Sequence, residues 1–218
     1  MKKETIISTI LWALLSLGAL LIPIRPFLAG GHQLPFTAIE FVGPLSGPFI
    51  GAIAGAVAVL AAKGAGFLIA GGAVSAFALA RLITPSFAAI YLGTKSKWIL
   101  LAPLVAIIGF LASPIGRQAP LITLVWAAAI ALWPLRRFFY ARALGATLTA
   151  HAIGGLLTIW LLPTTAKFWA TLPLVVILER AVFALGLTLA YIVIKEVSAR
   201  LADRWPAITL LVPAAVDR

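Results

Sequence analysis

The sequence predicts an all-α integral membrane protein, a polytopic helical bundle of about six transmembrane helices plus one re-entrant or broken segment. Three observations predict this class: the composition, the length of the apolar blocks and the placement of basic residues. Of 218 residues, 63% are hydrophobic and 11% are charged, whereas a soluble domain is about 45–50% apolar and about 25% charged. This composition excludes a soluble globular fold and a disordered chain, and the absence of cysteine excludes a disulfide scaffold.

Apolar blocks follow one another along the whole chain, and short polar or basic segments separate them. The first block follows a basic start and is about 20 residues long, longer than the roughly 7–15 residues of a signal-peptide core, so we expect a retained helix. We expect residues 1–195 to form one transmembrane bundle, and 196–218 to form a short cytoplasmic tail that begins as an amphipathic helix and breaks at Pro206. The predicted blocks are 5–24, 36–62, 67–93, 98–115, 119–135, 143–162 and 168–194.

The basic residues set the predicted orientation in the plasma membrane. Lys and Arg number 17 against 6 Asp and Glu, and in a membrane protein this excess marks cytoplasmic loops rather than a nucleic-acid surface. Seven simple crossings would put the basic segment 136–142 outside together with the basic tail. If one block enters and leaves the membrane on the same side, six crossings remain and both termini are cytoplasmic. Block 67–93, interrupted by Arg81 and Thr84-Pro85, and block 36–62, interrupted by Pro44 and Pro48, are both candidates for the returning block.

A run of small residues, VGPLSGPFIGAIAGAVAVLAAK, covers residues 42–63. On one continuous helix its glycines and alanines would form two smooth stripes, and small residues let helices approach closely in lipid. The run predicts either ordinary packing within the bundle or a face that docks a partner helix. The residues assigned to this predicted docking face are Gly47, Gly51, Gly55, Ala54, Ala58 and Ala62.

The same run resembles the S-components of ECF-type (energy-coupling factor) vitamin transporters. Many of these six-helix proteins carry a GP-x-x-G-x-x-x-G-like run on the second helix, similar to Gly47-Pro48-Phe49-Ile50-Gly51 through Gly55. They also tend to have a Pro-bearing outer loop before it, as Pro23, Pro26 and Pro35 would provide. The resemblance implies a substrate-binding membrane subunit of a small-solute importer, with separate ATPase and coupling transmembrane subunits as partners and no cofactor of its own.

Ionisable residues inside the apolar blocks are the candidates for a binding site. A charge at the bilayer centre costs about 2.5–3.5 kcal/mol on insertion scales, so such residues face the bundle interior and find partners. Their role is either structural ion pairing and snorkelling or recognition of a polar, even anionic, solute. Glu179 and Arg180 are adjacent, about 100° apart around a helix, which predicts that they serve different faces. A pairing of Arg180 or Arg81 with Glu40 is one hypothesis.

Tryptophans supply the remaining candidate. Trp160 and Trp169 flank the predicted outer loop 163–167, and Trp98, Trp133 and Trp205 lie near predicted inner loops, as in an aromatic belt. Alternatively, Trp160, Trp169 or Trp126 would stack on a flat ligand in an outward-facing pocket, and Trp126, which lies deeper, is the least well explained by the belt. The predicted substrate-binding set is therefore Glu40, Arg81, Trp126, His151, Glu179 and Arg180, and two distant histidines predict no metal site.

Three functions compete on these observations. The first is the solute-binding subunit, which needs an external energy source because Gly93-Thr94-Lys95-Ser96 lacks the spacing of a phosphate-binding loop. The second is an intramembrane enzyme with His151 or Glu179 as acid or base, although no motif of a known hydrolase is present and we expect no enzyme. The third is a structural subunit, which predicts no pocket of roughly 300 Å³ or more.

Overall fold

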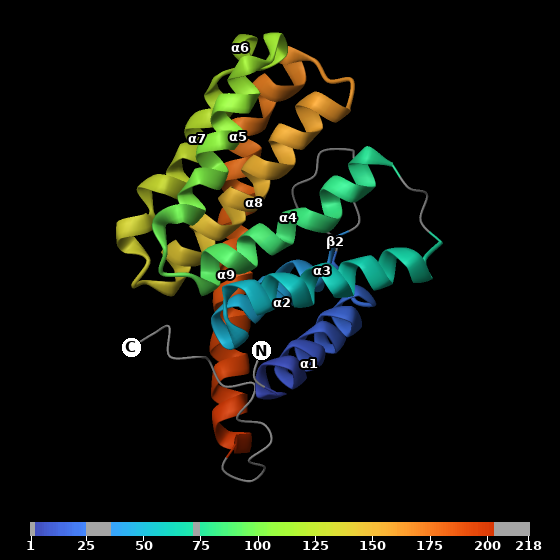
Figure 1. Ribbon diagram of the computed structural model, residues 1–218. Coiled ribbons are helices and arrows are strands. Elements are labelled where there is room, and N and C mark those ends of the chain that lie inside the picture. The colour runs from blue at the N-terminus through green and yellow to red at the C-terminus, as the bar shows by residue number, and fades with distance from the viewer. Residues whose placement is uncertain (1–2, 25–35, 72–74, 203–218) are drawn as a thin grey trace.

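The computed structural model describes residues 3–24, 36–71 and 75–202, and these are almost entirely helical (Figure 1). Two strands of two residues pair antiparallel, with Pro23 opposite Thr37 and Ile24 opposite Phe36. The all-α prediction is confirmed apart from this small ladder. The elements in order are α1 Lys3–Leu20, β1 Pro23–Ile24, β2 Phe36–Thr37, α2 Ile39–Ile50, α3 Ala52–Ile69, α4 Ala76–Gly93, η1 Lys97–Leu100, α5 Leu101–Ala112, α6 Pro114–Gln118, α7 Leu121–Ala131, η2 Trp133–Leu135, α8 Phe139–Leu161 and α9 Ala166–Ala202.

Three helices among the described residues are long and apolar enough to cross a membrane: Ala52–Ile69, Phe139–Leu161 and Ala166–Arg200. Three shorter apolar helices accompany them, at Ile6–Leu20, Lys97–Ala112 and Leu121–Leu135. Large apolar side chains cover their outer faces, among them Ile10 and Leu14 on α1 and Leu124 on α7. A surface of this kind fits lipid rather than water, which supports a membrane protein.

The chain reverses direction at Gly51, between α2 and α3. Gly51 has φ +96°, a conformation that favours glycine. The two helices then run antiparallel: the Ser46 hydroxyl lies 3.0 Å from the Gly55 carbonyl, and Gly43 faces Val59. The two stripes that the run would form on one continuous helix are therefore divided between two helices, because Gly51 ends one helix and begins the next.

The small residues of this run lie where the chain's own helices pack against one another. A Cβ at Gly47 would overlap the carbonyl of Ala89 on α4, and a Cβ at Gly55 would overlap the backbone of Gly47. Ala58 and Ala62 are also buried, while Gly51 and Ala54 are half-buried. Internal packing thus accounts for the buried members of the predicted docking face.

Block 67–93 is not interrupted at Arg81 and Thr84-Pro85, where the sequence predicted a break. Helix α4 runs from Ala76 to Gly93 through Arg81 and Pro85, and the chain instead leaves helical structure after Ile69. Pro85 has no N–H to donate to the carbonyl four residues earlier, which belongs to Arg81. The Lys63 ammonium donates to that carbonyl at 3.4 Å, so a neighbouring helix supplies a donor and α4 stays continuous.

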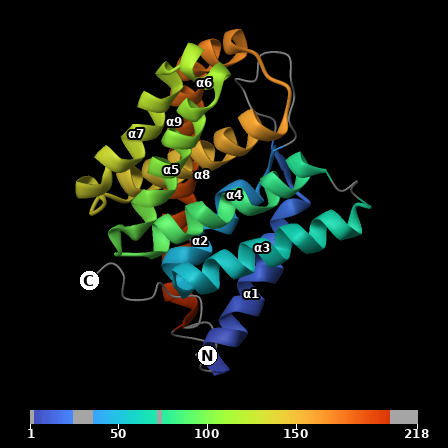
Figure 2. The same ribbon diagram turned by 45° about the horizontal axis from the view of Figure 1, so that its top comes forward.

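The second half of the chain forms an upright group of helices, with α5, α7, α8 and α9 side by side in both views (Figures 1 and 2). Helix α4 packs against α2 and α3 on one side and against α8 on the other, so it joins the two halves. Helix α9 has 37 residues and passes through the predicted boundary at 195 without a break. The predicted break at Pro206 in the tail and the predicted Pro-bearing outer loop over 25–35 lie outside the described residues.

Candidate functional site

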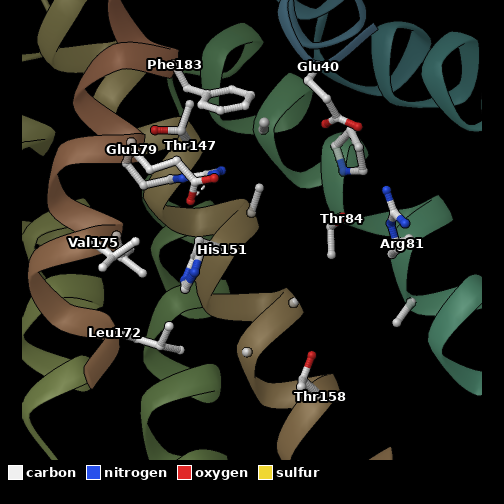
Figure 3. Close-up of a pocket in the computed structure, with 18 of the residues that line it drawn as sticks. Glu40, Arg81, Thr84, Thr147, His151, Thr158, Leu172, Val175, Glu179 and Phe183 are labelled. Atoms are coloured by element: carbon white, nitrogen blue, oxygen red, sulfur yellow. Dashed lines mark ion pairs between the residues drawn. The ribbon is translucent and has the colours of Figure 1, made fainter. Parts of the chain in front are cut away.

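A cavity of about 460 Å³ lies where the two halves meet. Helices α4, α8 and α9 form its walls, α2 and α3 contribute Glu40, Pro44 and Lys63, and the loop after α8 contributes Pro163 and Thr164. Figure 3 shows Glu179, Thr147 and His151 on one side of the cavity, with Glu40 and Arg81 on the other. The volume lies within the roughly 300–1,000 Å³ of small-molecule sites.

Helix α8 lines the cavity with one face. Thr147, His151, Gly154 and Thr158 follow one another at steps of three or four residues, the spacing of neighbours on a helix surface. Gly154 leaves the space open, because a Cβ there would meet only the Thr84 methyl at 3.5 Å. The face combines hydroxyl and imidazole groups with an opening for a ligand.

Glu40 on α2 pairs with Lys63 on α3, and both line the cavity. Their oxygen and nitrogen are 2.7 Å apart, and the side chains are 21% and 10% exposed. The sequence suggested Arg180 or Arg81 as the partner of Glu40 and did not identify Lys63. Lys63 lies within reach of Glu40 because the reversal at Gly51 brings residue 63 opposite residue 40 on the adjacent antiparallel helix.

Glu179 and Arg180 on α9 pair with each other, at 2.8 Å. The prediction that these neighbours serve different faces is wrong, since their long side chains bend together beside the cavity. The Arg180 guanidinium also lies 4.5 Å above the Phe183 ring, a cation–π contact. Its Nε is buried and has no hydrogen-bond partner, so one donor on this wall is unsatisfied.

His151 accepts a hydrogen bond from Trp126, which orients its ring. The indole Nε1 of Trp126 donates to Nδ1 of His151 at 2.9 Å, and the Trp126 ring is fully buried in T-shaped contacts with Phe110 and Trp169. Trp126 therefore does not line the cavity as predicted. An indole only donates, so in a neutral imidazole Nδ1 accepts and Nε2 carries the proton.

The tryptophans predicted to form the aromatic belt separate into exposed residues and packing residues. Trp98 and Trp160 are exposed, as expected of an aromatic belt, and Trp160 donates to the Gly109 carbonyl. Trp169 is buried, lines the cavity and donates to the Thr164 hydroxyl. Trp133 is buried beneath the Arg136 guanidinium, and Trp205 lies outside the described residues.

Five of the six predicted site residues line one cavity, the exception being Trp126. Sequence reasoning missed Lys63 and the threonines at 84, 147 and 158. The spacing of Thr147, His151 and Thr158 on one helical face was the signal that would have found two of them. In the described ranges, no group of three or more His, Cys, Asp or Glu side chains forms a metal site.

Comparison with known proteins gives no match: no family model, no curated protein and no solved structure is similar to this chain. What the chain does is therefore inferred from its own cavity and from the residues around it.

Proposed function

We propose that the chain is the substrate-binding membrane subunit of an importer for a small, vitamin-like solute, energised by a separate ATPase module. One observation carries this proposal: ionisable residues from distant parts of the sequence, Glu40, Arg81, His151, Glu179 and Arg180, surround one cavity. Charges in the apolar interior are costly. A cavity that collects them is explained by a polar solute that binds there.

The cavity also favours this proposal over its two competitors. A structural subunit predicts no pocket above roughly 300 Å³, and the cavity here is about 460 Å³. An intramembrane enzyme needs an acid–base partner within hydrogen-bond reach of His151. Its partner in the described part of the chain is the Trp126 indole, which supplies orientation and no acid–base chemistry.

The energy source is proposed to lie on other subunits. The chain has no phosphate-binding loop, and its resemblance to ECF-type S-components around residues 47–55 implies ATPase and coupling transmembrane partners. The reversal at Gly51 supports a topology in which the α2–α3 hairpin enters and leaves on the outer side. Six crossings then remain, both termini are cytoplasmic, and the cavity faces outward near Pro163 and Thr164.

Ligand binding tests the proposal directly. The chain is purified in detergent, and its thermal unfolding is followed with a panel of water-soluble vitamins and related small solutes. We expect one solute to raise the unfolding temperature, since a ligand that binds only the folded state stabilises it. Gly154→Leu fills the cavity and should abolish the shift, whereas Gly64→Leu, at a position with open space around its Cβ, should keep it.

Two results would overturn the proposal. If no solute in the panel shifts the wild-type transition, the cavity binds no such ligand. If a shift survives Gly154→Leu unchanged, the ligand binds elsewhere. Affinity purification from the native membrane should also recover an ATPase with a phosphate-binding loop, identified by mass spectrometry, and its absence would remove the importer role.

Accessibility tests the topology, and the chain is suited to it because it has no cysteine. Lys167→Cys and Lys97→Cys place single thiols at exposed positions after α8 and after α4. In intact cells, a membrane-impermeant maleimide should label residue 167 and leave residue 97 unlabelled until the cells are broken. The reverse pattern would invert the proposed orientation.

A further inference from the structure

The surroundings of His151 fix how its ring can hydrogen-bond to a solute. We propose that His151 determines which solutes the cavity accepts: Trp126 keeps the proton of the neutral imidazole on Nε2, and His151 donates it to a carbonyl-type acceptor of the solute. His151 is then a specificity-determining residue, and Trp126 is a positioning residue. This inference rests on the proposed function and names the chemistry by which its substrate is recognised.

The Trp126 indole is held on several sides. Its ring is fully buried and makes T-shaped contacts with Phe110 and Trp169, at centroid distances of 5.0 and 6.5 Å. It also lies against α8 at Gly155, where an added Cβ would overlap the ring. Gly155 stands one turn after His151 on the same face of α8, so the absence of a side chain there lets the indole N–H reach the imidazole.

The indole decides which nitrogen of His151 carries the proton. Nε1 of Trp126 lies 2.9 Å from Nδ1 of His151. Because an indole N–H only donates, Nδ1 accepts and Nε2 keeps the proton. A neutral imidazole without such a partner exchanges between two tautomers, and its Nε2 then acts as a donor in one and as an acceptor in the other. The Trp126 bond leaves Nε2 as a donor.

This donor is available to a solute. His151 is half-buried and lines the cavity, and its hydrogen bond in the described part of the chain is the one at Nδ1. Since the buried indole covers Nδ1, the accessible side of the ring is the one that carries Nε2. A solute that presents an N–H group or an ammonium there would bring two donors together and leave the Nε2 proton without an acceptor.

Apolar side chains lie beside the imidazole. Figure 3 shows the ring on the side of the cavity where Val175 and Leu172 of α9 lie, and both residues line the cavity. A solute with its carbonyl oxygen at Nε2 would place apolar surface against these side chains, where its burial favours binding. The inferred substrate class is therefore a molecule with a carbonyl-type acceptor on an apolar body.

Solid-state NMR tests the tautomer without any ligand. The chain has two histidines, so His32→Gln leaves His151 as the only imidazole. Carbon–nitrogen correlations identify Nε2 by its bond to Cδ2 and Nδ1 by its bond to Cγ, and the nitrogen shifts show which of them is protonated. We expect the proton on Nε2 alone in this background and a mixture of tautomers after Trp126→Phe. Trp160→Phe, which removes an indole N–H that bonds the Gly109 carbonyl, is the matched control.

Two probes of nearly the same shape test the preference for an acceptor. Benzamide presents a carbonyl oxygen, and benzamidine presents N–H donors in its place. Isothermal titration calorimetry of the purified chain should show benzamide binding at least about tenfold more tightly, a difference of about 1.4 kcal/mol. His151→Phe keeps a ring and should lower this ratio of affinities about tenfold. Comparing the ratio between variants cancels the charge of benzamidine and its partitioning into detergent.

Trp126→Phe should lower the same ratio by a smaller factor, because the Nε2–H tautomer is still one of two populated forms. Trp160→Phe should leave the ratio unchanged. If His151→Phe does not fold, Trp126→Phe and the NMR tautomer still decide.

The outcomes separate this inference from the function on which it rests. The inference is overturned if His151 carries its proton on Nδ1, if Trp126→Phe leaves the tautomer unchanged, if benzamide binds no better than benzamidine or neither binds, or if His151→Phe preserves the ratio. The importer proposal survives such a failure when the solute panel still gives a shift that Gly154→Leu abolishes. When the panel also gives no shift, both fail.

Discussion

The two halves of the molecule reach close packing by opposite means. In the first half, Gly47 on α2 meets Gly55 on α3 and Gly93 on α4, so that backbone touches backbone. In the second half, Trp126 meets the rings of Phe110 and Trp169 edge to face, at centroid distances of 5.0 and 6.5 Å. Small residues allow helices to approach in lipid, whereas aromatic rings fill the space between helices that stay further apart.

The two halves also differ in how their charged side chains pair. The first half pairs Glu40 with Lys63 across two helices, so this ion pair joins α2 to α3. The second half pairs Glu179 with Arg180 within one helix, which adds no contact between helices. We infer that the first ion pair contributes to the fold, and that the second is available for a ligand. Four substitutions test this comparison.

Gly47→Val should have the largest effect. Its side chain would collide with the backbone of α4 at Ala89, and backbone cannot move aside as a side chain can. We expect a loss of about 3 kcal/mol or more, seen as loss of the monodisperse peak in gel filtration. Gly18→Val is the control, because the Cβ position at Gly18 is open. Equal gel-filtration profiles for Gly47→Val and Gly18→Val would contradict the close contact between Gly47 and Ala89.

Lys63→Met should have the next largest effect, because it leaves the Glu40 carboxylate without its ammonium partner. We expect a loss of about 2 kcal/mol, less than the roughly 3–5 kcal/mol of a fully buried pair, since the side chains retain 10% and 21% exposure. Thermal unfolding measures it. The double variant Glu40→Gln/Lys63→Met should be more stable than Lys63→Met alone, and a still lower stability would argue against the pair.

Trp126→Phe should cost about 1–2 kcal/mol, because Nδ1 of His151 loses its hydrogen bond while the ring packing is mostly kept. Thermal unfolding again gives the change. Trp160→Phe removes a similar bond, to the Gly109 carbonyl, from an exposed ring and should cost less. A larger loss for Trp160 would show that burial is not what makes the Trp126 bond important.

Glu196→Gln should have the smallest effect. Glu196 and Arg200 form an ion pair on α9, but their side chains are 60% and 78% exposed. Exposed pairs of this kind contribute below about 0.5 kcal/mol. The unfolding temperature should be unchanged within error at low and moderate salt, and a clear loss would mean that this end of α9 is covered by something else.

Much of the fold follows from the sequence. The length and composition of the apolar blocks predicted the positions of α1, α5, α7, α8 and α9, because any long apolar stretch in lipid must be helical. The residues Glu40, Arg81, His151, Glu179 and Arg180 were predicted as one site, because buried charge is costly wherever it occurs.

What the sequence did not predict depends on contacts between distant residues. In the sequence, Gly47, Gly51 and Gly55 have the spacing of one face of a single helix. The reversal at Gly51 is evident only from the contact between Gly47 and Gly55. The donor to the Arg81 carbonyl, which Pro85 leaves without its helical partner, is the Lys63 ammonium of another helix. The role of Trp126 depends on a histidine 25 residues further along the chain. Local patterns do not encode such partners.

The brevity of α2 has a consequence for how the protein is made. Its 12 residues rise about 18 Å, short of the about 30 Å of hydrocarbon that a spanning helix must cross. A ribosome finishes α2 before it has made α3 or α4, two of the helices on which α2 packs. We therefore expect α2 to remain at the membrane surface during synthesis and to insert into the bilayer together with α3 and α4. Truncation after Ile50 should then leave α2 outside the bilayer.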